Sequence, residues 1–348
     1  MIKYLGSKRS LMPVLETLFR TTQARTALDL FTGTTRVAQA LKQQSMHVTA
    51  VDTASYSEVF AKTWIELDAS TVNLVELEEA VTRLNNLRGS AGYFTKAFCE
   101  QARYFQPKNG ERIDSIRAVI ESDYRQSWLY FPLLASLLVA ADKIDSTTGV
   151  QMAYLKSWSR RSSADLELKV PELMPGSGKS LRADANSAIE SLPAVELAYL
   201  DPPYNQHRYF GNYHIWETLV RWDSPETYGI ANKRLDTRDA ENKSQFNSKL
   251  TMPAALGQLI TNLKTETLVL SYNNESWLSR RELTDMCAKF GAVEILDFDF
   301  KRYVGSQIGG YNQSGELVGK PGAKRNLEHI VLAGSSRIVA ELVDSVRR

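Results

Sequence analysis

The chain has 348 residues, of which 43% are hydrophobic and 24% are charged, as in a soluble globular protein with one large α/β domain and a smaller one. Its net charge of +2 permits nucleic-acid binding but does not argue for it. The two cysteines, Cys99 and Cys287, have no Cys or His at metal-ligand spacing, which argues against zinc and a disulfide framework and favours buried thiols. No apolar run has the length of a membrane span, and the N-terminus lacks a signal-peptide core, so we expect a cytoplasmic protein.

The first residues, 3–8, read Lys-Tyr-Leu-Gly-Ser-Lys and precede a helix whose apolar positions include Leu11, Leu15 and Leu18. A Gly-Ser turn between two lysines at a helix start suits anion binding through backbone N–H groups. A solvated turn is the alternative for this segment taken alone.

Residues 26–52 have the pattern of a strand, a turn, a helix and a second strand. The first strand covers 26–31, the helix follows through Val37 and Leu41, and the second strand, 47–52, ends at Asp52. In dinucleotide-binding folds such an acid binds ribose hydroxyls. The turn has one glycine, Gly33, where that fingerprint has three, which favours a nucleoside cofactor without phosphates.

From about residue 61 to 158, helical spacing of apolar residues dominates, and 130–141 is a strongly apolar helix. The stretch is too long for an ordinary crossover. We therefore predict a helical insertion over 61–165 and a catalytic domain formed by 1–60 and 166–348. Near its end, Lys156, Arg160 and Arg161 surround Trp158, either as phosphate contacts or as a solvated charged face.

The strand expected over 180–185 carries Asp184 near its end, and the apolar run 197–200 leads into Asp201-Pro202-Pro203-Tyr204. Because proline has no N–H to donate to a neighbouring strand, the two prolines end the strand. These residues therefore lie at the carboxyl edge of a sheet, where ligands bind. The carboxylate of Asp201 and the carbonyl of Pro202 could accept both hydrogens of a planar exocyclic amine, while Tyr204 stacks on the base. A proline-rich turn with a solvated aspartate is the alternative.

Residues 205–214 hold two of the four histidines, His207 and His214. Attack by a neutral amine needs no early proton removal, so we interpret this segment as a mobile lid over base and cofactor. Neither histidine has a plausible third partner for a metal. The polar residues 229–249 are expected to form an exposed loop region that could reach DNA.

The C-terminal part alternates again between strands and a helix. Strands are expected over 267–272, 293–300 and 327–333, the last two as an antiparallel pair, with a helix over 278–290. Between the paired strands lies a basic, glycine-rich excursion containing Lys301, Arg302, Lys320 and Lys324. Such a ribbon suits phosphate contacts and groove entry.

Taken together, these motifs resemble the DNA adenine-N6 methyltransferases of the alpha motif order, from restriction-modification systems or phages. The resemblance rests on motifs in the family's order: residues 3–8, 29–33, 109–114, 201–207, 213–214 and 328–330, with Asp52 and Asp184. It implies a Rossmann-like S-adenosylmethionine-dependent methyltransferase fold, with a mixed seven-stranded sheet and an inserted helical target-recognition subdomain. An aspartate at position 201 favours adenine over cytosine N4.

The resemblance also implies roles for individual residues. A flipped adenine in duplex DNA would meet the catalytic group Asp201, Pro202, Pro203 and Tyr204. S-adenosylmethionine would contact Tyr4, Lys8, Asp29, Phe31, Gly33, Asp52, Asp184 and Asp201. DNA would meet Lys156, Arg160, Arg161, His207, Tyr209, Lys301, Arg302, Lys320 and Lys324, and no metal is expected. The family often has a second glycine where this chain has Thr35.

Two other interpretations remain open at this point. One keeps the chemistry but changes the acceptor to RNA adenine or to cytosine N4. The other is a catalytically inactive relative that keeps the fold and binds DNA, which the departure at Thr35 motivates. For the DNA adenine-N6 methyltransferase, the resemblance implies a partner as well, a cognate restriction endonuclease that acts separately.

Overall fold

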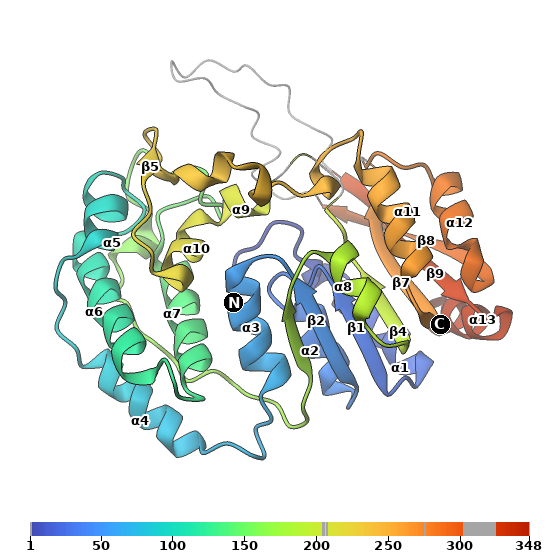
Figure 1. Cartoon of the computed structure of the whole chain (residues 1–348), viewed down its shortest axis with the longest axis horizontal. Helices are drawn as coiled ribbons and strands as arrows, with labels where there is room; N and C mark the ends of the chain where they lie inside the picture. The colour runs from blue at the N-terminus through green and yellow to red at the C-terminus, as the bar shows by residue number, and fades with distance from the viewer. Residues whose placement is uncertain (1, 204–205, 207, 275, 302–324, 348) are drawn as a thin grey trace. The chain divides into compact units, whose positions relative to one another are not determined.

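The computed structural model describes residues 2–203, 206, 208–274, 276–301 and 325–347. Within these residues, seven strands form a sheet in the order β3-β2-β1-β4-β7-β9-β8 (Figure 1). The pairs β1–β4, β2–β3 and β4–β7 are parallel, and β9 is antiparallel to β7 and β8. The expected mixed seven-stranded sheet is confirmed. The strands are β1 (Thr26–Leu30), β2 (His47–Asp52), β3 (Lys179–Arg182), β4 (Val195–Leu200), β7 (Thr265–Asn273), β8 (Ala292–Lys301) and β9 (Arg325–Gly334).

The register of the central strands fixes where the chain leaves the sheet. Leu30, the last residue of β1, pairs with Leu200, the last residue of the parallel strand β4. The segments that follow these two strands therefore leave the sheet at the same edge. The strand order reverses direction here, and in open α/β sheets such a switch point is where ligands bind.

Local sequence signals account for the helix boundaries. In α1, Pro13 occupies the first turn, where a missing N–H costs nothing, and Leu15 and Leu18 are fully buried. Ser279 and Glu282 form a capping box that starts α12. The α-helices are α1 (Met12–Thr22), α2 (Arg36–Gln43), α3 (Ser55–Ala61), α4 (Leu74–Asn85), α5 (Tyr93–Thr95), α6 (Pro107–Tyr124), α7 (Tyr130–Ile144), α8 (Ala185–Ser191), α9 (Tyr209–Asn212), α10 (His214–Arg221), α11 (Met252–Asn262), α12 (Arg280–Cys287) and α13 (Ser336–Arg347).

The chain packs as two compact units. The first comprises Met1–Arg9, Phe31–Ala188 and His207–Ser244, and the second Ser10–Leu30, Ile189–Gln206 and Gln245–Arg348. The first unit holds most of the helices and a short hairpin, β5 (Thr227–Tyr228) with β6 (Lys233–Arg234). These bounds differ from those of the predicted catalytic domain, 1–60 with 166–348, and of the predicted helical insertion, 61–165. The assignment of catalysis and target recognition to these two parts remains a prediction. Among the described residues, no helix is long and apolar enough to cross a membrane.

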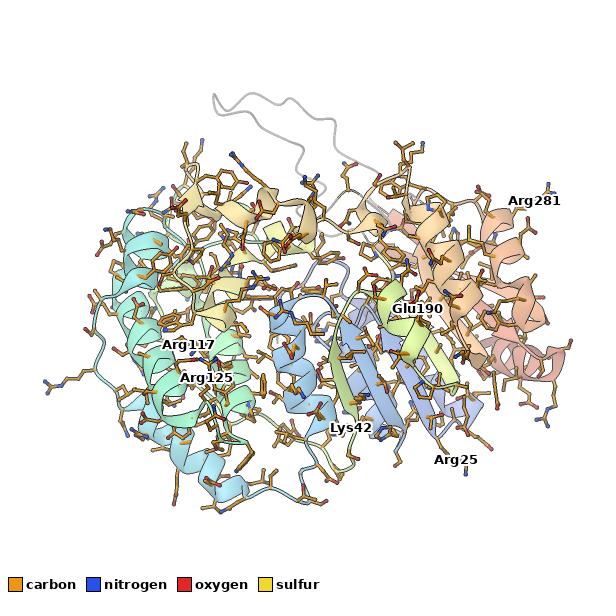
Figure 2. All side chains as sticks on the ribbon, in the orientation of Figure 1. Arg25, Lys42, Arg117, Arg125, Glu190 and Arg281 are labelled. Carbon is orange, nitrogen blue, oxygen red and sulfur yellow. The ribbon has the colours of Figure 1, made fainter. Side chains whose placement is uncertain are left out.

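Two buried cations hold segments of the first unit together. Arg117, on α6, is fully buried (Figure 2) and donates from Nε to the carbonyl of Leu219 at 2.7 Å and from Nη2 to that of Val220 at 3.0 Å. Lys42, also labelled in Figure 2, donates to the carbonyls of Trp64, Ile65 and Leu67 at 2.6–3.1 Å. Both cations satisfy carbonyls at the ends of helical segments.

The structure differs from two sequence-based expectations about loops and agrees with the one about the cysteines. The lid assigned to 205–214 is wrong at its far end, because Tyr213 and His214 are fully buried next to and within α10. The region 229–249 is not a plain exposed loop, since Arg234 and Phe246 are 1% exposed. The cysteines are buried free thiols, as predicted, and burial raises the pKa of Cys287 to about 12.

Candidate active site

The loop that follows β1 is fastened to the end of β2 by backbone hydrogen bonds. The N–H groups of Phe31 and Thr32 both donate to the carbonyl of Val51, each at 3.0 Å. Phe31 and Gly33 have φ values of 69° and 52°, in the left-handed region that glycine adopts at little cost. The loop therefore turns sharply and brings the backbone of Gly33 to the end of β2.

Asp52, predicted to bind ribose hydroxyls, is oriented by this loop. Its Oδ2 accepts the N–H of Gly33 at 2.8 Å, and its Oδ1 accepts the N–H of Ala54 at 3.0 Å. Burial raises the pKa of the Asp52 carboxyl above its ordinary value, and these hydrogen bonds act in the opposite direction. The backbone of Thr53 and the side chain of Ser57 act on the same carboxyl, so Asp52 is held in one orientation from several sides.

Tyr4 lies directly against the same loop. A Cβ added at Gly33 would lie 3.0 Å from Cε1 of Tyr4, so only glycine leaves room for this ring. The ring stacks on Tyr213, with centroids 4.8 Å apart, and on Tyr209, at 5.4 Å, and its hydroxyl lies 3.3 Å from that of Tyr56. Burial, then the charges of Tyr56 and Asp52, hold the pKa of Tyr4 well above 10, which keeps the phenol neutral.

The residues on either side of Tyr4 are anchored. The N–H of Lys3 donates to Oδ2 of Asp142 at 3.1 Å, and Nζ of Lys3 lies 2.8 Å from Oδ1 of Asp145. The N–H of Leu5 donates to the hydroxyl of Tyr213 at 2.6 Å. Both carboxylates are only 3% exposed. The position of the Tyr4 ring is thus fixed from both sides.

The other predicted cofactor residues lie in three different settings. Lys8 is 6% exposed in a 3-10 turn, and Asp29 is buried in β1 opposite Tyr199 of β4. Asp184 caps the start of α8, where its Oδ1 accepts the N–H groups of Asn186 at 3.0 Å and Ser187 at 3.3 Å. A role of Asp184 toward a ligand amino group would use its remaining acceptor positions.

The predicted catalytic residues begin directly after β4. Asp201 is half-buried and Pro202 is buried, in the second unit, where the chain leaves the sheet beside the end of β1. Tyr204 lies outside the described residues. The strand therefore ends where the two prolines predict, and the aspartate stands at its carboxyl end.

The predicted DNA-binding residues are not equivalent in the structure. Lys156 and Arg160 are exposed, whereas Arg161 donates from Nη2 to the carboxylate of Asp145 and from Nε to its carbonyl at 2.7 Å, so its guanidinium is held internally. Tyr209 stacks on Tyr4 and so belongs to the surroundings of the loop after β1. Lys301 is the last residue of β8, and His207, Arg302, Lys320 and Lys324 lie outside the described residues.

Sequence reasoning named Tyr213 only within the motif at 213–214 and Tyr209 only as a DNA contact; it did not predict that both rings stack on Tyr4. Tyr56 lies four residues after Asp52, in the first turn of α3, and this nearness in sequence could have identified it. The stacking of Tyr213 carries no such local signal, because Tyr213 follows Asp52 by 161 residues. Glu217, also unpredicted, is fully buried and accepts the N–H of Ser55 at 2.9 Å and its hydroxyl at 2.6 Å. These contacts join α10 to the start of α3.

Comparison with known proteins places these observations in a family. The sequence model of the D12 class N6 adenine-specific DNA methyltransferases matches residues 4–286. The modification methylase StsI of Streptococcus sanguinis is 32% identical over 91% of this chain and 51% of its own, and M.FokI of Planomicrobium okeanokoites is 28% identical over 87% and 50%. This chain thus spans about half the length of these two relatives.

A third relative is similar in length to this chain. The type II methyltransferase M.NlaIII of Neisseria lactamica is 29% identical over 87% of this chain and 92% of its own. Among solved structures, a putative S-adenosylmethionine-dependent methyltransferase from Streptococcus mutans covers 96% of this chain at 10% identity, with 50% of its own length aligned and a TM-score of 0.35, too low to support an argument. On the family match over most of its length, the chain belongs to the D12 class of N6 adenine-specific DNA methyltransferases.

Proposed function

We propose that this protein transfers a methyl group from S-adenosylmethionine to N6 of an adenine that is flipped out of duplex DNA. The observation that carries the proposal is the position of Asp201 and Pro202 immediately after β4, in register with the end of β1. Family membership supplies the substrate class, and the mixed sheet supports the fold. Asp201 is half-buried and Pro202 is buried, which does not favour a solvated turn.

The residues of the first unit fit a nucleoside cofactor. Gly33 lets the Tyr4 ring lie directly against the loop after β1, Asp52 presents an oriented carboxylate for hydroxyl groups, and Tyr4 forms an aromatic wall. We assign Lys8, Asp29, Phe31 and Asp184 to the same ligand. When bound, S-adenosylmethionine supplies an electrophilic methyl group, and we assign Asp201 to the amine that receives it.

The protein's part in the reaction is to position and polarise the amine. The adenine amine is a poor nucleophile because its lone pair is delocalised into the ring. With Asp201 accepting one hydrogen and the Pro202 carbonyl the other, the nitrogen becomes more tetrahedral and its lone pair is freed. The methyl group would pass directly to the nitrogen as its bond to sulfur breaks, which would leave S-adenosylhomocysteine, and the surplus proton of the methylated nitrogen would go to solvent water. Catalysis is positioning and electrostatics, with no covalent enzyme intermediate.

DNA recognition belongs to the same proposal. Duplex DNA is the partner, with target recognition assigned to 61–165 and catalysis to 1–60 and 166–348. Lys156 and Arg160 are retained as phosphate contacts. A modification role beside a separate cognate endonuclease follows from the names of the relatives. Genomic DNA from cells expressing the protein should then carry N6-methyladenine at one short sequence.

The test compares Asp201→Ala with the unchanged protein. Purified protein is incubated with duplex DNA or RNA, and the nucleosides are identified by mass spectrometry, while calorimetry measures S-adenosylmethionine binding. We expect N6-methyladenine in DNA only, lost in Asp201→Ala with cofactor affinity within about threefold. Asp165→Ala removes an exposed carboxylate that pairs with Lys108 and should behave as wild type. Near-normal activity of Asp201→Ala, or methylation of RNA or of cytosine, would contradict the proposal.

A further inference from the structure

Helix α3 begins shortly after Asp52, but its N-cap position carries no side chain that can accept a hydrogen bond. The N-cap residue is Ala54, and no side-chain cap is formed there. The first N–H groups of a helix have no partner within the helix, and buried N–H groups are rarely left unsatisfied. Ser55, the first residue of α3, is only 1% exposed, so its N–H needs an acceptor from within the protein.

Glu217 of α10 supplies this acceptor from 162 residues further along the chain. Its Oε1 accepts the N–H of Ser55 at 2.9 Å, and its Oε2 accepts the hydroxyl of Ser55 at 2.6 Å. Glu217 is fully buried, and α10 packs against α3 within the first unit (Figure 1). Because one carboxylate binds both the backbone and the side chain of Ser55, it fixes this residue in one position.

The charge of Glu217 is balanced on its own helix. Nε of Arg221, four residues later, lies 3.1 Å from Oε2 of Glu217, and Nη1 of Arg221 lies 3.3 Å from Oδ2 of Asp236. Burial raises the pKa of Glu217, whereas the contacts with Ser55 and Arg221 act in the opposite direction. Burying a carboxylate costs free energy even when it is paired, so stability alone gives no reason for a glutamate at this position.

The segment that Glu217 fastens also orients the carboxylate of Asp52. The N–H of Ala54 donates to Oδ1 of Asp52 at 3.0 Å, and the backbone of Thr53 acts on the same carboxyl. These two residues are the ones that separate Asp52 from Ser55 in the sequence. A shift of Ser55 is therefore passed directly to the backbone groups that hold the carboxylate.

We propose that Glu217 is a positioning residue for the cofactor, which fixes Ser55 and thereby holds Asp52 in the orientation that accepts the ribose hydroxyls. The inference rests on the proposed function, in which Asp52 contacts the ribose, and adds to it the residue that sets this contact. Glu217 acts through Ser55 and needs no contact with the cofactor. Hydrogen bonds weaken steeply with angle and distance, so a small rotation of the Asp52 carboxylate weakens its bonds to the hydroxyls.

The test compares two ligands that differ only in the ribose hydroxyls. Calorimetry measures the Kd of S-adenosylhomocysteine and the Kd of its analogue that lacks both hydroxyls. The ratio of the second constant to the first, which we call the hydroxyl ratio, reports what the hydroxyls contribute to binding. A variant that is only less stable loses binding-competent protein for both ligands equally, so its hydroxyl ratio does not change.

Four variants separate the effect of geometry from those of charge and stability. Glu217→Met removes both acceptors at a similar side-chain length. Glu217→Gln keeps an oxygen for the N–H of Ser55 and an amide that can donate to the hydroxyl, and Ser55→Ala removes the hydroxyl bond alone. The matched control is Glu121→Met, because Glu121 likewise pairs with an arginine four residues away on its own helix, Arg117 of α6.

We expect a hydroxyl ratio of at least about 30 in the unchanged protein, as hydrogen bonds to a charged acceptor would give. Glu217→Met should lower this ratio about tenfold, and Glu217→Gln should keep it within about threefold of the wild-type value. Ser55→Ala, which retains the backbone bond, should fall between these two variants. Glu121→Met should lose stability in urea unfolding and keep the wild-type hydroxyl ratio.

Two results would overturn the inference while leaving the proposed function intact. One is a wild-type hydroxyl ratio in Glu217→Met or, if that variant does not fold, in Ser55→Ala. The other is an equal fall of the ratio in Glu217→Gln and Glu217→Met, which would indicate an effect of charge and not of geometry. If the unchanged protein binds S-adenosylhomocysteine with a hydroxyl ratio near one, the ribose contact assigned to Asp52 is wrong and the inference fails with it. If it binds no S-adenosylhomocysteine at all, the proposed function fails first.

Discussion

Replacing Gly33 by alanine tests how the N-terminal residues complete the loop after β1. At a φ of 52°, alanine costs about 1–2 kcal/mol in backbone strain. Its Cβ would also lie 3.0 Å from Cε1 and 3.2 Å from Oη of Tyr4, so the ring must move. Loss of the stacking on Tyr213 costs about 0.5–1.5 kcal/mol more. The free energy of unfolding should therefore fall by about 2–3 kcal/mol.

The chain offers a matched control in Gly176→Ala. Gly176 has a φ of 85°, and a Cβ there would meet no atom within 4 Å, so this variant carries the backbone cost alone. Urea unfolding measures stability, and calorimetry measures S-adenosylmethionine binding. We expect Gly33→Ala to weaken that binding at least about tenfold, or about 1.4 kcal/mol, and Gly176→Ala to leave it unchanged.

Two outcomes of this comparison would refute the reasoning. Equal cofactor affinity in Gly33→Ala and wild type would mean that the Tyr4 ring and Gly33 do not border the cofactor. Equal stability losses in the two glycine variants would mean that the Tyr4 ring yields without cost, in contradiction to its anchoring through Lys3 and Leu5.

Three further predictions concern buried charges. Arg117→Met should cost about 3–5 kcal/mol in urea unfolding, because it removes the buried cation that pairs with Glu121 and leaves the carbonyls of Leu219 and Val220 without this donor. Arg125→Met, which removes the exposed partner of the same Glu121 (Figure 2), should cost less than about 1 kcal/mol. Burial raises the pKa of Asp142 to about 6, so the folded state binds the extra proton and stability should fall by up to about 3 kcal/mol as pH rises from 4 to 7, a slope that Asp142→Asn removes. Burial lowers the pKa of His214 to about 3, so protonation of the unfolded chain should cost about 2 kcal/mol as pH falls from 6.5 to 5, and His214→Gln should abolish this loss in denaturant titrations at each pH. A flat profile in the wild type between pH 4 and 7 that persists in both variants would contradict both assignments.

The sequence was most informative where the signal is local. The strand ending at Asp52 and the strand ending before Asp201 were both predicted, because apolar runs followed by an acid or by prolines fix a strand end without knowledge of the rest of the fold. The antiparallel pair β8 and β9 was predicted for the same reason, from two apolar runs separated by polar residues.

The sequence was least informative where a residue's environment depends on distant partners. Residue type alone predicts that arginine and lysine are exposed. Arg117 and Lys42 are nevertheless buried, because carbonyl groups of other segments accept their hydrogen bonds. The left-handed conformation of Thr35, with φ 60°, was likewise unpredicted, although the residue had been noted as a departure from glycine. His214 was misplaced in a lid because its burial against Gln151 arises only in the folded unit.

The bond between the N–H of Leu5 and the hydroxyl of Tyr213 spans 208 residues. Since contacts this remote form only after a large loss of chain entropy, the aromatic wall on which the methyl donor would rest is assembled late in folding. A nascent chain emerging from the ribosome would have to reach residue 213 before the N-terminal residues could form this contact. Ligand affinity should therefore appear abruptly with chain length rather than grow with each added element.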